Sequence, residues 1–135
     1  MSAFEKYVVG VGAGTIPAGK LIRAAIARHL RDLETCEERG LFFDTKAAEH
    51  AIKFFPLLKH SKGKSAESKF KLEPWQAFVV GSIFGWKKRD GLRRFRVAYV
   101  EVPRKNGKST IAAGIALYCL VADKEPGAEV YIAAT

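Results

Sequence analysis

Apolar residues in the first half of the chain recur every three or four positions, which is the period of an α-helix. The clearest case is residues 20–38, where charged side chains fill the intervening positions and predict an amphipathic helix closed by Arg39-Gly40. Residues 4–9 predict one or two helical turns, which the glycine-rich residues 10–14 end. The chain is therefore expected to begin with a small helical unit.

Another helical pattern begins at Lys46, where Asp44 and Thr45 are both suitable N-cap residues. Pro56 has no backbone N–H and is expected to bend or end this helix. The apolar residues 41–43, just before it, predict a short connector that inserts into the core.

A polar stretch rich in serine and lysine, residues 60–71, is typical of a linker. It divides the chain into an N-terminal helical region, residues 1–70, and a second region, residues 71–135. Pro74 suits the first turn of a helix that opens the second region.

The second region has the pattern of an α/β fold. Residues 94–102 mix β-forming and polar side chains as a strand does, and residues 111–121 are almost wholly apolar and long enough for a buried helix. After a turn that contains proline and glycine, residues 129–134 predict a second buried strand. Strand, helix and strand in this length predict two parallel strands joined by a right-handed crossover.

The loop between the predicted strand and the buried helix carries the candidate chemistry. It consists of Val102-Pro103-Arg104-Lys105-Asn106-Gly107-Lys108-Ser109-Thr110. Such a loop presents backbone N–H groups at the positive end of the helix dipole, which favours an anion such as a phosphate. Lys108 can reach the β- and γ-phosphates of a nucleotide, and Ser109 can bind Mg²⁺ through its hydroxyl. Val102 stands where the usual motif has its first glycine, so an ordinary turn with a chance lysine is the alternative.

A second Gly-Lys-Ser tripeptide, Gly63-Lys64-Ser65, shows that the tripeptide alone is weak evidence. It follows a polar run, with no predicted strand before it and no apolar helix after it. We therefore expect a solvated loop there and place the phosphate-binding loop at Gly107.

Gln76, near the start of the second region, has two alternative roles. Its amide offers a donor and an acceptor side by side, which match N6 and N7 of adenine and would select ATP over GTP. A solvent-facing helix glutamine is an equally suitable interpretation of the local sequence.

The chain has 135 residues and is 48% apolar, which is typical of a single globular domain. Its net charge is +9, and between Lys59 and Lys108 there are fourteen basic and only four acidic residues. This segment therefore carries the entire positive excess, a concentration that favours a polyanionic partner.

The basic residues of that segment fall into two groups. Those in the linker suit a solvated loop equally well, whereas those around Asp90-Gly91 favour an anion-facing turn. The first group is Lys62, Lys64, Lys69 and Lys71, and the second is Lys87, Lys88, Arg89, Arg93 and Arg94.

The cysteines and histidines suggest no metal centre. Cys36 and Cys119 lie on predicted helices without ligand neighbours, so we expect buried free thiols in a reducing cytosol. His29 is expected to be a satisfied surface or boundary side chain rather than a ligand. No apolar run has the length of a membrane span, and the N-terminus lacks the pattern of a signal peptide.

Several stretches together resemble the large subunit of tailed-bacteriophage terminases, the ATP-driven motors that package DNA into a procapsid and cut the concatemer. In the second region they are Leu72-Glu73-Pro74-Trp75-Gln76, residues 102–109 and Ala128-Glu129-Val130-Tyr131-Ile132-Ala133-Ala134-Thr135. Ile16-Pro17-Ala18-Gly19-Lys20, Arg28-His29-Leu30 and His60-Ser61-Lys62-Gly63 are similar to the family's N-terminal region. The resemblance covers nearly the whole chain.

The resemblance implies an ASCE-like P-loop NTPase fold, of which the chain holds only the first strands of the parallel sheet. The family commonly lacks the first glycine of the loop and has an arginine inside it, as Val102 and Arg104 are here. The resemblance further implies that Gln76 lies in the adenine-binding Q motif and that Arg104 contacts phosphates or senses hydrolysis. Lys108 would hold the γ-phosphate as a catalytic residue with Arg104, and Ser109 would hold Mg²⁺. The full set implied to bind ATP is Gln76, Pro103, Arg104, Lys105, Asn106, Gly107, Lys108, Ser109 and Thr110.

The same resemblance implies partners and a location. The partners are double-stranded DNA, the terminase small subunit and the portal protein, and the full-length motor would form a homo-oligomeric ring. The implied location is the cytoplasm of the bacterial host, with no membrane involved.

Parts of that family's machinery are missing from the sequence. The ATPase needs an acidic strand end for Mg²⁺ and a glutamate that activates water, and the nuclease needs metal-binding acids. Glu101 and Glu129 do not follow the apolar strand and aspartate that the missing motif would show. We therefore expect an N-terminal fragment of a longer protein, or a truncated product, that binds ATP weakly and does not hydrolyse it at motor rates.

Two other interpretations stay open. One is a different P-loop module, such as a helicase-like or kinase-like domain. The other is a non-enzymatic basic module that binds DNA or a protein through residues 59–96.

Overall fold

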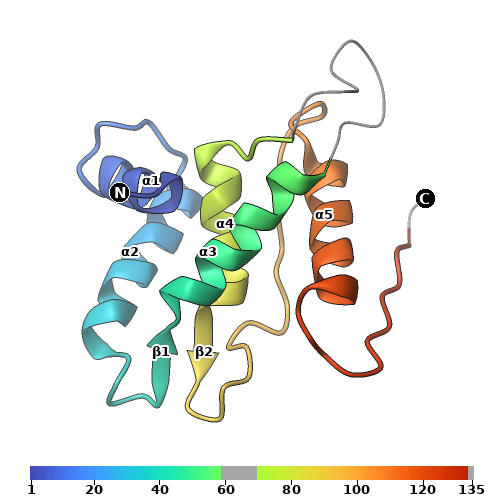
Figure 1. Ribbon diagram of the computed structural model, residues 1–135. Helices are drawn as coiled ribbons and strands as arrows, with labels where there is room; N and C mark the ends of the chain where they lie inside the picture. Colours follow the sequence, from blue (N-terminus) through green and yellow to red (C-terminus); the bar gives the residue numbers. More distant parts are fainter. Residues whose placement is uncertain (59–69, 134–135) are drawn as a thin grey trace.

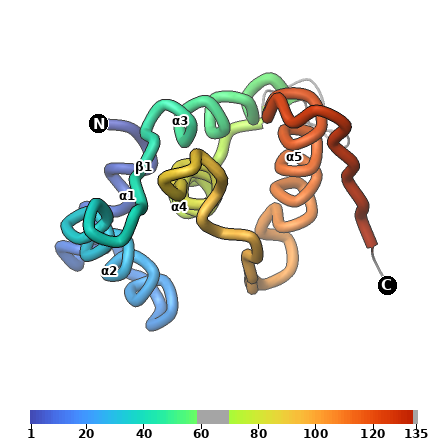
Figure 2. The backbone as a smooth tube through the Cα atoms, turned by 90° about the horizontal axis from the view of Figure 1, so that it is seen from below, coloured from blue at the N-terminus to red at the C-terminus, as the bar shows by residue number. Residues whose placement is uncertain are grey.

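A helix without a single charged residue, α4 (Pro74–Gly85), lies at the centre of the computed structural model. The structure describes residues 1–58 and 70–133. Figure 1 and Figure 2 show α1 (Ala3–Gly12), α3 (Thr45–Phe54) and α5 (Lys108–Val121) around it. Since α4 is apolar on nearly every side, this central position removes most of its surface from water.

The N-terminal helices form where the apolar spacing predicts them. Helix α1 is longer than expected and is capped by Ser2, whose hydroxyl accepts from the backbone N–H of Glu5 at 3.2 Å. Helix α2 (Lys20–Thr35) confirms the predicted amphipathic helix, but it ends before Arg39-Gly40, which lie in the turn that follows. The sequence placed this end three residues too late, at residue 38 instead of Thr35.

Helix α3 confirms the predicted cap. The carboxylate of Asp44 accepts from the backbone N–H of Ala47 at 3.0 Å, and a 3₁₀ turn (Phe55–Leu57) containing Pro56 ends the helix.

A short antiparallel pair replaces the expected apolar connector at residues 41–43. Strand β1 (Leu41–Phe43) pairs with β2 (Trp86–Lys88), with Leu41 opposite Lys88 and Phe43 opposite Trp86. After β2 the chain turns at Gly91, whose φ of +82° favours glycine, and the N–H of Arg94 donates to the carbonyl of Trp86 at 2.9 Å. The predicted turn around Asp90-Gly91 is thereby confirmed.

The predicted parallel strands are not formed. Residues 94–102 and 129–133 have no strand partner among the described residues and are instead irregular, extended chain. Figure 1 and Figure 2 show the two segments on opposite sides of α5, whereas paired strands must lie about 4.8 Å apart. The described residues therefore do not show the predicted parallel sheet, and their one sheet is the antiparallel pair of β1 and β2.

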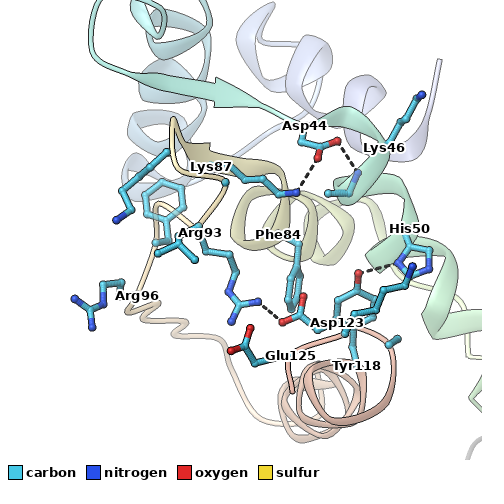
Figure 3. A pocket seen from close by; sticks show the side chains of 17 residues that line it. Asp44, Lys46, His50, Phe84, Lys87, Arg93, Arg96, Tyr118, Asp123 and Glu125 are labelled. Atoms are coloured by element: carbon cyan, nitrogen blue, oxygen red, sulfur yellow. Dashed lines mark hydrogen bonds and ion pairs between the residues drawn. The ribbon is translucent and has the colours of Figure 1, made fainter. Parts of the chain in front are cut away.

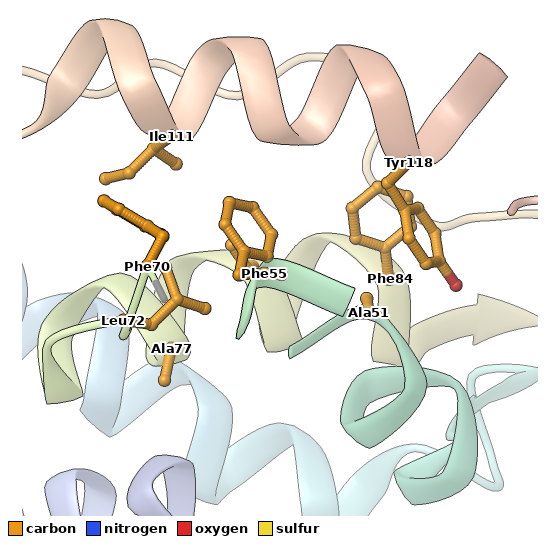
Figure 4. Packing of buried hydrophobic residues seen from close by; sticks show 9 residues of the cluster. Ala51, Phe55, Phe70, Leu72, Ala77, Phe84, Ile111 and Tyr118 are labelled. Carbon is orange, nitrogen blue, oxygen red and sulfur yellow. The ribbon is translucent and has the colours of Figure 1, made fainter. Parts of the chain in front are cut away.

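Buried apolar side chains join both halves of the chain. Figure 4 shows Phe55 facing α5, with Phe70 and Ile111 on one side of its ring and Phe84 on the other. A Cβ added at Gly114 would lie only 2.3 Å from a ring carbon of Phe55, so α5 approaches this ring closely. The cluster consists of Ala51, Phe55, Phe70, Leu72, Ala77, Val80, Phe84, Ile111 and Tyr118.

This cluster crosses the predicted boundary between residues 1–70 and 71–135, and that division stays a prediction. Most of the predicted linker, residues 60–71, and the second Gly-Lys-Ser tripeptide lie outside the described residues.

His29 is buried in the core. The sequence had predicted a side chain at the surface or at the boundary of the core. The side chain of His29 is 5% exposed, and its Nδ1 accepts a hydrogen bond from the indole of Trp86. The amphipathic pattern missed this because His29 and Asp32 belong to a polar cluster inside the core, next to Trp86 and Arg94.

Candidate functional site

The loop that precedes α5 has a backbone geometry suited to an anion. Gly107 is the N-cap of α5 with φ of +75°, and Lys105 also has a positive φ, 65°, while Asn106 between them does not. Alternation of this kind turns successive N–H groups towards a common centre, as in the backbone nests that bind anions.

The carbonyl groups of the loop are held by side-chain amides. Asn106 donates from Nδ2 to the carbonyls of Pro103 at 3.2 Å and Arg104 at 3.3 Å. Gln76 donates from Nε2 to the carbonyl of Asn106 at 3.2 Å. Within residues 1–58 and 70–133, the backbone N–H groups of Arg104, Lys105 and residues 107–110 have no hydrogen-bond partner, whereas the turn at Arg104-Lys105 directs the N–H of Asn106 towards the carbonyl of Pro103. The carbonyls of the loop are therefore hydrogen-bonded within the protein, whereas most of its backbone N–H groups are free to bind a ligand.

Gln76 is brought to the loop from a distant part of the chain. It occupies the first turn of α4 and is 4% exposed, which excludes the solvent-facing alternative. Its Oε1 accepts from the backbone N–H of Glu73 at 2.9 Å, so the amide joins the start of α4 to the loop. Its assignment to adenine stays a prediction.

The charged and hydroxyl side chains of the loop are accessible. Lys108, Ser109 and Thr110 form the first turn of α5 and are exposed, as are Arg104 and Lys105. Within the described part of the chain none of the three cations forms an ion pair. Their charges are free for a ligand.

An apolar groove of about 580 Å³ begins beside Lys108 and follows α5. Its walls come from α4, α5 and the extended residues 93–100, and include Ile83, Ile111 and Ile115. Val97 and Tyr99 at its edge are 86% exposed.

A larger cavity of about 1060 Å³ lies at the other end of α5. Figure 3 shows Phe84 at its centre, with Tyr118 and His50 on one side and Arg93 and Asp123 facing each other. The Tyr118 hydroxyl and Nδ1 of His50 are hydrogen-bonded at 2.8 Å. Since α5 rises about 1.5 Å per residue over 14 residues, this cavity lies about 20 Å from the phosphate loop.

The basic residues around Asp90-Gly91 mostly pair with acids instead of facing an external anion. Lys87 contacts Asp44 at 2.7 Å, and Arg93 pairs with Asp123. Lys88 lies 3.4 Å from Asp90, and Arg94 contacts Asp32 at 2.7 Å. The predicted anion-facing turn is wrong for Lys87, Arg93 and Arg94, because folding brings Asp44, Asp123 and Asp32 to them, whereas Lys88 contacts an acid of the same turn. Lys62, Lys64 and Lys69 lie outside the described residues.

The sequence did not identify the structural role of Asn106. An asparagine next to glycine in a tight loop is a recognisable signal, because its short amide can reach nearby carbonyls. Asp32 could not be found in this way, since its partners Arg39 and Arg94 are known only from the fold.

Two classes of feature were not found in the described part of the chain. Residues 1–58 and 70–133 hold no cluster of three or more side chains suited to binding a metal ion. No helix there combines the length and hydrophobicity needed to cross a bilayer. Cys36 and Cys119 are free thiols, as expected, but half-buried.

Comparison with known proteins gives one match. Residues 74–135 match the family model described as terminase large subunit, ATPase domain. No curated protein and no solved structure matches the chain.

Proposed function

Residues 74–135 belong to the family of terminase large subunit ATPase domains, and from this premise we propose that residues 102–110 bind the triphosphate of ATP in a phage DNA-packaging motor. The family implies use of a nucleotide, and its match begins at the helix that carries Gln76.

The observation that carries the proposal is that the carbonyl groups of the loop are hydrogen-bonded within the protein while most of its N–H groups are not. The carbonyls of Pro103, Arg104 and Asn106 accept from side-chain amides, while the N–H groups of Arg104, Lys105 and residues 107–110 have no partner among the described residues. A triphosphate offers only acceptors near neutral pH, so it complements a loop of free donors at a helix N-terminus.

The side chains of the loop then have distinct roles. Lys108 supplies a positive charge for the β- and γ-phosphates, and Arg104 a second one. The exposed hydroxyl of Ser109 would serve as a ligand of Mg²⁺, which would supply positive charge to neutralise the phosphates. Lys105 and Thr110 contribute through backbone N–H groups, whereas Pro103 has none and contributes through the shape of the loop.

Calorimetric titration of the purified chain with ATP and Mg²⁺ tests this proposal. We expect saturable binding that Lys108→Ala weakens about tenfold or more, because a charge-assisted hydrogen bond is lost. The matched control is Lys64→Ala, in the other Gly-Lys-Ser tripeptide, which should bind as the unaltered chain does. Equal loss in both variants, or no binding by the unaltered chain, would exclude the loop as the site.

Turnover is a separate matter. We propose that this chain alone does not hydrolyse ATP at motor rates, since neither an acidic metal ligand nor a water-activating glutamate is evident in its sequence. A malachite-green assay measures this, and Mg²⁺-dependent phosphate release that Lys108→Ala abolishes would overturn it.

Double-stranded DNA is the proposed polyanionic partner, and the terminase small subunit and portal protein are proposed partners of a ring-forming full-length motor in the host cytoplasm. The family's link to DNA packaging and the positive charge of residues 59–108 support the DNA partner. DNA affinity that falls steeply with salt and is unaffected by Lys108→Ala would indicate a DNA contact separate from the nucleotide loop.

A further inference from the structure

Gln76 is nearly inaccessible, although it lies next to the exposed phosphate loop. Its residue exposure is 4%, and both ends of its amide are already in use inside the protein. Recognition of adenine requires the amide oxygen and an N–H group together on one free edge. Here the oxygen accepts from Glu73, one N–H donates to Asn106 and the residue is buried, so the described arrangement presents no such edge to a ligand.

We infer that Gln76 is a positioning residue that holds the phosphate loop by the carbonyl of Asn106. The peptide unit between Asn106 and Gly107 is planar and trans, so its carbonyl and its N–H point in opposite directions. Since Nε2 of Gln76 holds the carbonyl towards α4, the N–H of Gly107 is turned away from α4. One hydrogen bond therefore fixes the direction of a donor that the proposed triphosphate site needs.

Gly107 fits closely against the same amide. A Cβ added there would lie 3.0 Å from Nε2 of Gln76, and the φ of +75° is already unfavourable for other residues. Gln76 and the peptide before Gly107 thus form one packed unit, and the N-terminus of α4 sets the position of the loop.

Backbone dynamics of the nucleotide-free chain test this role directly. Gln76→Met keeps the approximate volume of the side chain and removes both hydrogen bonds. We expect lower NMR order parameters for the backbone amides of residues 104–110, because the loop loses its link to α4. Ser82→Ala, on the same helix, should leave the loop unchanged, and it is a suitable control because its buried hydroxyl has no partner among the described residues. Unchanged order parameters in the loop of Gln76→Met would overturn the inference.

Binding measurements separate this role from adenine recognition. The role rests on the proposed function for its effect on nucleotide affinity, so ATP, GTP and inorganic tripolyphosphate are compared. A lost positioning bond should weaken all three by a similar factor, about threefold to tenfold for one net hydrogen bond. Weaker binding of ATP alone would overturn the inference in favour of adenine recognition. If the unaltered chain binds none of the three, the proposed function fails, while the order parameters of the loop still decide whether Gln76 positions it.

Discussion

The indole Nε1 of Trp86 donates a hydrogen bond of 3.0 Å to Nδ1 of His29 in the core, where the side chains are 1% and 5% exposed. The rings of Phe4, Phe43 and Phe78 surround the imidazole. Burial lowers the pKa of His29 to about 4, so it is neutral at physiological pH and can accept from Trp86.

The buried imidazole should make the protein sensitive to mild acid. The pKa of an unfolded histidine is about 6.5, so between pH 6.5 and 4 only the unfolded chain takes up this proton. The stability from the neutral ring is complete above pH 6.5 and falls by about 1.4 kcal/mol for each unit below it. Urea unfolding measured at several pH values gives this slope.

His29→Gln supplies the control, because the glutamine can accept from Trp86 but does not titrate. It should be less stable at pH 7 and lose less stability towards pH 4.5. His50→Gln, at an exposed position, should retain the acid sensitivity. A slope unchanged in His29→Gln would contradict the assignment.

A buried ion pair joins α2 to the segment that leads towards the phosphate loop. Asp32 is 1% exposed and contacts Arg94 at 2.7 Å, and Arg94 also lies over the Trp86 ring. Asp32→Asn leaves Arg94 without its counter-charge and should lower the free energy of unfolding by about 3 kcal/mol. Arg39→Met should cost about 1 kcal/mol or less, because the side chain of Arg39 is 46% exposed. Chemical denaturation of the two variants gives this difference.

The double variant Asp32→Asn/Arg94→Met distinguishes a pair from two independent residues. It should be more stable than the sum of the single losses predicts, since no charge is left buried alone. Additive losses would show that the two residues act separately.

Protonation of Asp32 should lower the stability of the fold in a second pH range, more acidic than that of His29. Burial raises the pKa of Asp32, but hydrogen bonds from Arg94 and Arg39 outweigh it and hold that pKa below the ordinary value. The carboxylate therefore stabilises the fold above about pH 4, and this contribution is lost as the pH falls through the lowered pKa. Asp32→Asn should remove this loss of stability at low pH and retain the loss that begins near pH 6.5 and comes from His29.

The helices could be predicted because their signals are local. The cap at Asp44, the apolar spacing of α2 and the proline that opens α4 each determine structure over a few residues. The strands could not be predicted, because a strand depends on its neighbour. Residues 94–102 have β-forming side chains, yet the bond from Arg94 to Trp86 directs the start of the segment into a turn with β2.

The same distinction applies to the candidate site. Gly107-Lys108-Ser109 was found because its motif is contiguous, and Gly107 has the positive φ that such a loop uses. The contact between Gln76 and Asn106 joins residues 30 positions apart, so no local pattern contains it. The sequence could identify Gln76 as a candidate site residue, but only the folded structure shows which groups its side chain contacts.

Close packing at Gly114 gives a prediction for the core. Gly114→Val would place side-chain atoms against the fully buried ring of Phe55 and should destabilise the fold by about 2 kcal/mol through overpacking. Ala113→Val, at the exposed neighbouring position, should cost only about 0.5 kcal/mol of helix propensity. Thermal unfolding of both variants gives the comparison, and equal losses would show that the ring can move aside.

Lys124 has a φ of +58°, a left-handed conformation that costs a non-glycine residue about 1–2 kcal/mol. Lys124→Gly should relieve this cost and, after the greater flexibility of glycine in the unfolded chain is subtracted, raise stability by about 0.5 kcal/mol. Lys53→Gly is the matched control, because it removes the same charge from helix α3, where glycine costs about 1 kcal/mol. The two substitutions should therefore shift the unfolding midpoint in opposite directions. Destabilisation in both would show that Lys124 stabilises the turn after α5 by contacts that outweigh its backbone strain.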